Sequence, residues 1–116
     1  DLQYHFVNQH ECRVYNPSDI VIDPMQRYHL QIIITGFHGK LDMINKTTGD
    51  ELVYSESLDP SDRLMYDDVN VYKNGKLANG SSNLAWMRLN KGWNDIKIFG
   101  YDQIDIRFHF KFVYLN

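Results

Sequence analysis

Three aromatic residues are the side chains of this sequence most able to hold a ligand: Trp86, Trp93 and Tyr101. Sugar-binding domains stack exposed aromatic rings on pyranose rings, because an aromatic side chain offers a large apolar area and a polar edge. Trp93 falls in a predicted turn and should be exposed, whereas Trp86 falls in a predicted strand, where tryptophan is more often a core residue. Exposure of Trp93 in a concave face would favour carbohydrate binding, and its burial a structural role.

The sequence carries no local motif for covalent catalysis or phosphate binding. It has no Gly-x-Ser-x-Gly elbow, and Cys12 is the only thiol. Glycine-rich nucleotide-binding loops are absent, and an all-β chain lacks the strand-to-helix turn that they need. We therefore expect no enzyme and no cofactor. A hydrolase with two carboxylates facing one another in a cleft leaves no sequence signature and stays open as the weakest alternative.

Metal binding is not indicated either. The five histidines lack the paired spacing of zinc sites. The most acidic stretch, which contains Asp59, Asp62, Asp67 and Asp68, lacks the spacing and central glycine of a known calcium loop. Turn formation accounts for these aspartates, so we expect no metal ion.

Length and composition predict one domain with its own core. The chain has 116 residues, of which 43% are hydrophobic, and a formal net charge of −3. Interspersed charges with an acidic excess argue against nucleic acid binding. The longest apolar run, residues 32–34, is too short to span a membrane, so no membrane insertion is expected. Because the chain begins at Asp1 rather than methionine, we expect a fragment of a longer protein, with residues 1–9 as a linker.

Strict alternation near the C-terminus indicates the strand that organises the fold. Apolar residues occupy positions 104, 106, 108, 110 and 112, and mostly polar residues lie between them. A period of two places one face of a strand in the core and the other in water. A slip of one residue would expose every phenylalanine, so the register should be fixed and the strand central.

Shorter strands are predicted at residues 10–15, 28–35, 41–44, 51–55, 63–72, 84–89 and 96–99. Segments 28–35 and 41–44 are expected to form one hairpin, 41–44 and 51–55 a second, and Asn74-Gly75 is the strongest hairpin-turn signal. Segment 10–15 is expected at a sheet edge. Turns recur about every ten residues, as in an all-β antiparallel β-sandwich or barrel, and we expect the sandwich over residues 1–116.

Several of these segments, taken in order, resemble the C-terminal domain of distal tail proteins of long-tailed, non-contractile bacteriophages. The matching features are Asn45-Lys46-Thr47-Thr48-Gly49, the Asn74-Gly75 turn, the segment from Leu89 to Ile96, and the closing aromatic strand that ends Val113-Tyr114-Leu115. The resemblance covers residues 14–115. Lys91 departs from the family pattern, which often has proline there, and this affects only the stiffness of the turn.

The resemblance implies a galectin-like jelly roll, similar also to carbohydrate-binding modules, at the tail tip of the virion. Such proteins assemble in the host bacterial cytoplasm into a hexameric ring, built by an N-terminal domain that this chain does not contain. The outer domain docks receptor-binding or other tail-tip proteins, or contacts host cell-wall carbohydrate. The short predicted loops make docking through an inserted arm doubtful. The isolated domain is expected to be a monomer. The alternative from another class is a carbohydrate-binding module that binds cell-wall or other polysaccharide.

Overall fold

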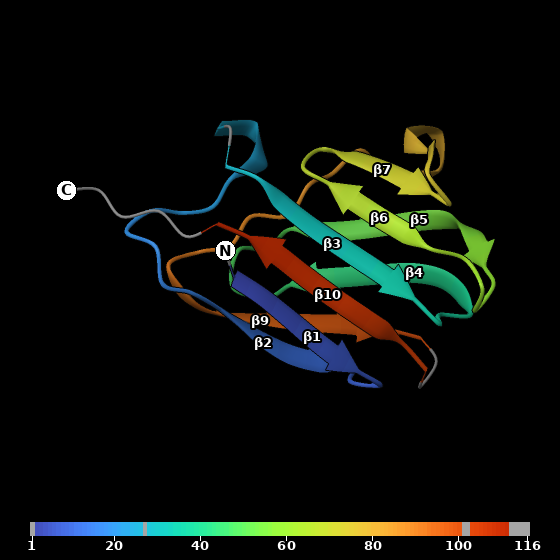
Figure 1. Ribbon diagram of the computed structural model, residues 1–116, viewed down its shortest axis with the longest axis horizontal. Helices are drawn as coiled ribbons and strands as arrows, with labels where there is room; N and C mark the ends of the chain where they lie inside the picture. The colour runs from blue at the N-terminus through green and yellow to red at the C-terminus, as the bar shows by residue number, and fades with distance from the viewer. Residues whose placement is uncertain (1, 27, 101–102, 112–116) are drawn as a thin grey trace.

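Ten β-strands form two antiparallel sheets that pack face to face in the computed structural model, which describes residues 2–26, 28–100 and 103–111 (Figure 1). One sheet has the order β1 (Leu2–Val7), β10 (Asp105–Phe110), β3 (Leu30–Thr35), β6 (Leu64–Asp67), β7 (Asn70–Lys73) and β8 (Lys76–Leu77). The other has the order β2 (Glu11–Asn16), β9 (Gly92–Phe99), β4 (Gly39–Asn45) and β5 (Glu51–Leu58). Two short 3₁₀ turns, η1 (Pro24–Gln26) and η2 (Asn79–Ser81), lie in the connections. The predicted all-β sandwich of a single domain is confirmed.

Strand β10 lies inside its sheet, between β1 and β3, as its alternation predicted. Ile106, Phe108 and Phe110 point into the core, each no more than 2% exposed. Phe108 pairs with Ile32 of β3, which is also buried, so the register aligns apolar faces across neighbouring strands. The predicted continuation at position 112 lies outside the described residues.

The core fills the space between the two sheets. Its largest fully buried side chains include Tyr54 of β5 and Phe37 of the β3–β4 connection. Burying an aromatic side chain of this size removes roughly 150–250 Å² from water, so these rings contribute much of the driving force for packing the sheets together.

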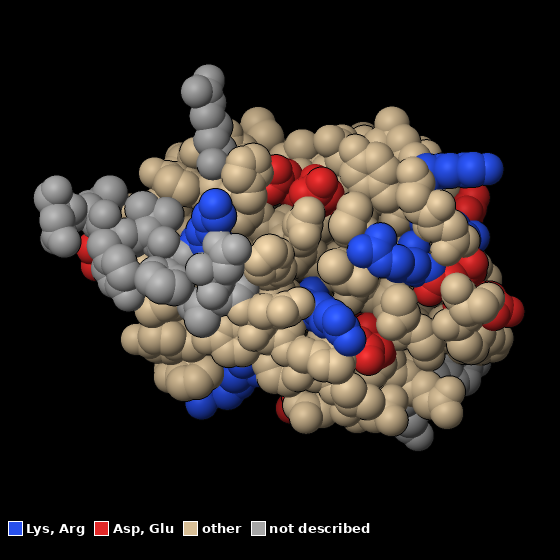
Figure 2. All heavy atoms as spheres, viewed as in Figure 1, with Lys and Arg blue, Asp and Glu red and all other residues tan. Residues whose placement is uncertain are grey.

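On the described part of the outer face of the six-stranded sheet, Lys and Arg lie among Asp and Glu (Figure 2). On β10, Asp105 lies 2.9 Å from the imidazole of His5 on β1 and 3.7 Å from the guanidinium of Arg107. These pairs are partly exposed and add little stability, but they keep the face polar.

Three sequence-based expectations differ from the structure. First, β3 and β4 do not form a hairpin, because β3 belongs to the six-stranded sheet and β4 to the four-stranded one. The connection between them turns at Gly36, which has φ of +71°, and buries Phe37 between the sheets. A sequence with a glycine between two strands looks the same whether the strands form a hairpin or belong to different sheets, so the sequence could not distinguish the two.

Second, residues 2–7 form β1, paired with β10 over its whole length, although a linker was expected at 1–9. Tyr4 and Phe6 pack against the core, and their rings lie 6.3 Å apart. The short alternation of Tyr4 and Phe6 with polar neighbours was the available signal for this strand.

Third, residues 84–89 are not a strand. Leu84 has φ of +60°, which an extended strand cannot accommodate, and Leu89 makes only an isolated bridge with Ile22. The other predicted strands are found at β2, β3, β4, β5 and β9, with residues 63–72 divided into β6 and β7. Asn74 and Gly75 have φ of +52° and +81° and connect β7 to β8, so the predicted hairpin is confirmed.

Candidate functional site

Three buried asparagines lie at one end of the four-stranded sheet. Asn16, Asn45 and Asn94 are each no more than 1% exposed. Asn45 at the end of β4 donates from Nδ2 to the backbone oxygen of Arg88 at 2.9 Å and to Oδ1 of Asn94 at 3.1 Å. Its own Oδ1 accepts the backbone N–H of Thr47 at 3.0 Å, which shapes the β4–β5 turn.

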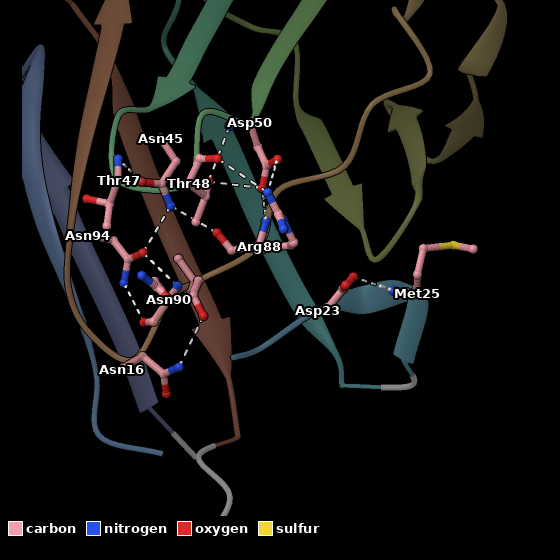
Figure 3. A network of polar contacts seen from close by, with 11 residues as sticks. Asn16, Asp23, Met25, Asn45, Thr47, Thr48, Asp50, Arg88, Asn90 and Asn94 are labelled. Atoms are coloured by element: carbon pink, nitrogen blue, oxygen red, sulfur yellow. Dashed lines mark hydrogen bonds and ion pairs between the residues drawn. The ribbon is translucent and has the colours of Figure 1, made fainter. Parts of the chain in front are cut away.

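Asn94 of β9 continues the network (Figure 3). Its Oδ1 accepts the N–H of Asn90 at 2.8 Å, and its Nδ2 donates to the backbone oxygens of Asn90 and Gly92. Asn16 at the end of β2 donates to the oxygen of Leu89 at 3.2 Å. These amides replace the missing ladder hydrogen bonds of residues 84–91, so an irregular segment is fixed by side chains from three strands.

An ion pair fixes Arg88 within this segment. Asp50 receives the Nε–H of Arg88 at 2.9 Å on Oδ2 and the Nη2–H at 3.0 Å on Oδ1. Oδ2 also accepts the backbone N–H of Arg88 and the hydroxyl of Thr48. Partial burial acts to raise the pKa of Asp50, but the hydrogen bonds and charge of Arg88 and the hydroxyl of Thr48 outweigh it and lower that pKa. The pair is therefore ionised at neutral pH, with a bidentate geometry that orients the guanidinium.

Beside this pair is a surface hollow of about 290 Å³, lined by Asp23, Asp50, Ala85, Trp86 and Arg88. We call it the Arg88 hollow. The backbone bridge between Ile22 and Leu89, with both N–H···O distances at 2.9 Å, sets Asp23 beside Arg88. Asp23 Oδ1 accepts the N–H of Met25 at 3.0 Å, which holds the carboxylate in place (Figure 3).

Trp86 forms part of the wall of this hollow and is half-buried. Because residues 84–89 are irregular, the indole is presented by a connecting segment rather than by the interior of a sheet. The hollow thus brings together a half-buried indole, carboxylate acceptors and guanidinium donors. Such a set can bind a small polar ring by stacking and hydrogen bonds.

Trp93 lies elsewhere, on the outer face of the four-stranded sheet, and is 51% exposed. It pairs in register with Tyr15 of β2, whose ring centroid is 4.9 Å away. The guanidinium of Arg13 lies 4.5 Å over the indole and donates to Asp95 at 3.1 Å. The exposure expected for Trp93 is present, but Arg13 occupies one face of its ring, and Trp93 does not line the Arg88 hollow.

Tyr101 lies outside the described residues. Sequence reasoning named Trp86 but missed Asp23, Asp50 and Arg88, which surround it. No local pattern joins these three residues, because 27 positions separate Asp23 from Asp50 and 38 separate Asp50 from Arg88.

The Cys12 thiol and the aspartates of the 59–62 turn have structural roles. Burial raises the pKa of the Cys12 thiol to about 12, which keeps it protonated and unreactive. Asp59 and Asp62 accept backbone N–H groups within their own turn. Within residues 2–26, 28–100 and 103–111, no three histidine, cysteine or acidic side chains gather as metal ligands. The same part of the chain contains no helix with the length and apolar character to cross a membrane.

The architecture is a β-sandwich of two antiparallel sheets, in which buried amides of the four-stranded sheet bind the irregular segment 84–91. No protein-family model matches the chain, and no curated protein is significantly similar to it in sequence.

Proposed function

We propose that this chain is the non-enzymatic outer domain of a distal tail protein of a long-tailed bacteriophage. The observation that carries the proposal is that two motifs of the resemblance meet in space. Asn45 opens the Asn-Lys-Thr-Thr-Gly motif and Asn94 belongs to the Leu89-to-Ile96 motif, and their side chains share a hydrogen bond of 3.1 Å although 49 positions separate them. Strands β4 and β9 are neighbours in the four-stranded sheet, so both motifs lie at the same end of that sheet.

The turns of these motifs fit the same interpretation, whereas the closing Val113-Tyr114-Leu115 lies outside the described residues. The Asn45–Gly49 motif forms the β4–β5 turn, with Gly49 at φ of +84°, and Asn74-Gly75 forms the β7–β8 turn. As a galectin-like outer domain at the virion tail tip, the sandwich would present its polar faces to receptor-binding or other tail-tip proteins. A ring-forming domain encoded elsewhere in the full protein would supply the hexameric assembly.

Immunogold electron microscopy tests this role. Antibodies raised against the purified domain are applied to phage particles from the strain that carries the gene, with pre-immune serum as the control. The proposal expects gold at the distal end of a non-contractile tail. Label on the capsid, or particles that remain unlabelled while the antibody detects the protein in the free lysate, would refute it.

Carbohydrate binding is a second candidate, favoured by the Arg88 hollow. That hollow combines the indole of Trp86 with a hydrogen-bond donor, Arg88, and carboxylate acceptors, Asp23 and Asp50. It is compatible with a host-surface contact by a tail protein and equally with a carbohydrate-binding module.

A further inference from the structure

We propose that the Arg88 hollow binds one neutral saccharide ring, with Trp86 as the stacking wall, Asp23 as the hydroxyl acceptor and Arg88 as the hydroxyl donor. This inference rests on the carbohydrate-binding candidate above and assigns the contact to Trp86 rather than to the more exposed Trp93.

Arg88 arrives at the hollow already oriented. Its Nε–H and one Nη2–H bind Asp50, and Nη2 also donates to the backbone oxygen of Thr48 at 3.3 Å. Within the described residues, no hydrogen bond engages Nη1, and the side chain is 41% exposed. The two Nη1–H donors are thus free for ligand oxygens, and little side-chain entropy is lost when they bind.

Asp23 supplies the complementary acceptor. Its Oδ1 is held by the N–H of Met25, while within the described part of the chain Oδ2 accepts no hydrogen bond. Asp50, in contrast, uses both oxygens on Arg88 and Thr48. Asp50 is therefore a positioning residue, and Asp23 is the carboxylate that can accept a ligand hydroxyl.

Trp86 and Ala85 supply the apolar part of the hollow. The two residues follow Leu84, which is 70% exposed and has φ of +60°. A left-handed conformation is unfavourable at a leucine, and the Ser82 hydroxyl supports it by accepting the N–H of Leu84. The strained turn directs the following residues toward the hollow instead of continuing a strand.

The charges favour a neutral ligand. The hollow is bordered by two carboxylates and one guanidinium, so an anionic sugar would be repelled by Asp23. A neutral sugar donates one hydroxyl to Asp23 and accepts from Arg88 at another, while its C–H face covers the indole. The volume of about 290 Å³ lies at the lower end of ligand pockets, which fits a single ring better than an extended stack.

Trp93 offers less. One ring face is already occupied by Arg13, and the hollow next to it is lined by residues that include Arg13 and Asp95 but not the indole. A sugar stacking there would have to displace the cation–π contact.

The two tryptophans allow a direct test, because each single substitution leaves one tryptophan. The intact domain, Trp93→Phe and Trp86→Phe are titrated with neutral oligosaccharides of glucose, galactose, rhamnose and N-acetylglucosamine, following tryptophan fluorescence and binding heat. We expect saturable binding that persists in Trp93→Phe with a fluorescence change from Trp86. Trp86→Phe should bind more weakly, with no change from Trp93.

Asp23→Asn provides the second arm and keeps the size of the side chain. Loss of one charge-assisted hydrogen bond should weaken binding about tenfold. Asp105→Asn, on the opposite sheet, is the matched control and should bind like the intact domain. Binding lost in Trp93→Phe but retained in Asp23→Asn would overturn the assigned site while leaving carbohydrate binding intact. Absence of binding across the panel at millimolar ligand would overturn the inference, whereas the tail-tip role is decided separately by immunogold labelling.

Discussion

Single buried amides determine the shape of this domain at the residue scale. Asn45 and Asn94 are fully enclosed, and each satisfies backbone groups that no strand partner reaches. An amide can do this because it has both donors and acceptors on one short side chain. Neither a carboxylate nor an alkyl group can replace it.

Asn45→Asp should destabilise the domain strongly. The substitution removes the Nδ2 donor and places a carboxylate oxygen against two acceptors, the Arg88 carbonyl and Asn94 Oδ1. We expect the free energy of unfolding to fall by about 3 kcal/mol or more in urea denaturation. Asn90→Asp, at an exposed position, is the control and should change it by less than about 0.5 kcal/mol. Equal effects of the two substitutions would contradict this account of the network.

Glu51 gives a second prediction at this scale. A hydrogen bond with Asp42, followed by the negative charge of Asp42, raises the pKa of the half-buried Glu51. Because this pKa is raised in the folded state, the proton shared by Glu51 and Asp42 stabilises the fold at acid pH. This stabilisation is lost as the pH rises through the folded-state pKa.

Glu51→Gln should therefore raise Tm at pH 7, where it removes repulsion, and change it less at pH 4. Thermal unfolding at both pH values measures the difference, with Glu11→Gln as the control, because Glu11 is 66% exposed and pairs only at 3.9 Å with the exposed Lys46. A lower Tm at pH 7 in Glu51→Gln would show that the two carboxylates do not repel.

At the scale of elements, the segment 84–91 is held by tertiary contacts rather than by its own hydrogen-bond ladder. The Asp50–Arg88 pair joins the start of β5 to this segment across 38 positions. Because the pKa of Asp50 is lowered, its contribution to stability is complete above the unfolded-state pKa and is lost as the pH falls through the folded-state value.

Asp50→Asn should lower the free energy of unfolding by about 1–3 kcal/mol at pH 7, toward the smaller value because Arg88 is partly solvated. The difference from the unsubstituted domain should shrink at a pH below the ordinary aspartate pKa of about 3.9, because the lowered pKa of Asp50 then ceases to favour the folded state in full. Urea titrations at the two pH values measure this. A penalty independent of pH would mean that charge contributes nothing to the pair.

Elements with a strong local period were predictable from sequence, and those held by distant side chains were not. The alternation at 104–110 determined the buried face of β10, and Asn74-Gly75 determined a turn whose φ values are local properties. Residues 84–89 are rich in apolar side chains and resemble a strand. Their backbone groups instead bind Asn16, Asn45 and Asp50, which lie between 38 and 73 positions away. Asp23 lies beside Arg88 because the backbone of Ile22 pairs with that of Leu89, 67 positions away. Of the residues that line the hollow, only Trp86 could therefore be named from the sequence.

For the whole molecule, the large exposed apolar residues are spread over both sheets and several connections. They include Val7 on β1, Met25 in η1, Leu77 on β8, Leu84 in the irregular segment and Phe99 on β9. Tyr15 and Trp93 lie side by side with ring centroids 4.9 Å apart, but in the described part of the chain this pair is smaller than the continuous apolar area that a stable subunit interface needs.

The isolated domain is therefore expected to be a monomer. Size-exclusion chromatography with light scattering should give a mass near 13.7 kDa at all accessible concentrations. A hexamer would place assembly contacts on this sandwich and would contradict the proposal that a separate domain builds the ring.

The enclosure of Asn45 also bears on how the domain can be produced. Asn45-Lys46-Thr47 is a glycosylation acceptor sequence, yet the amide nitrogen that would carry the glycan donates two hydrogen bonds in the interior. Glycosylation in the eukaryotic secretory route precedes completion of folding, and a glycan at this position has no space between β4 and the segment that carries Arg88. Expression in a bacterial cytoplasm, where this modification does not take place, leaves the amide free to reach its partners.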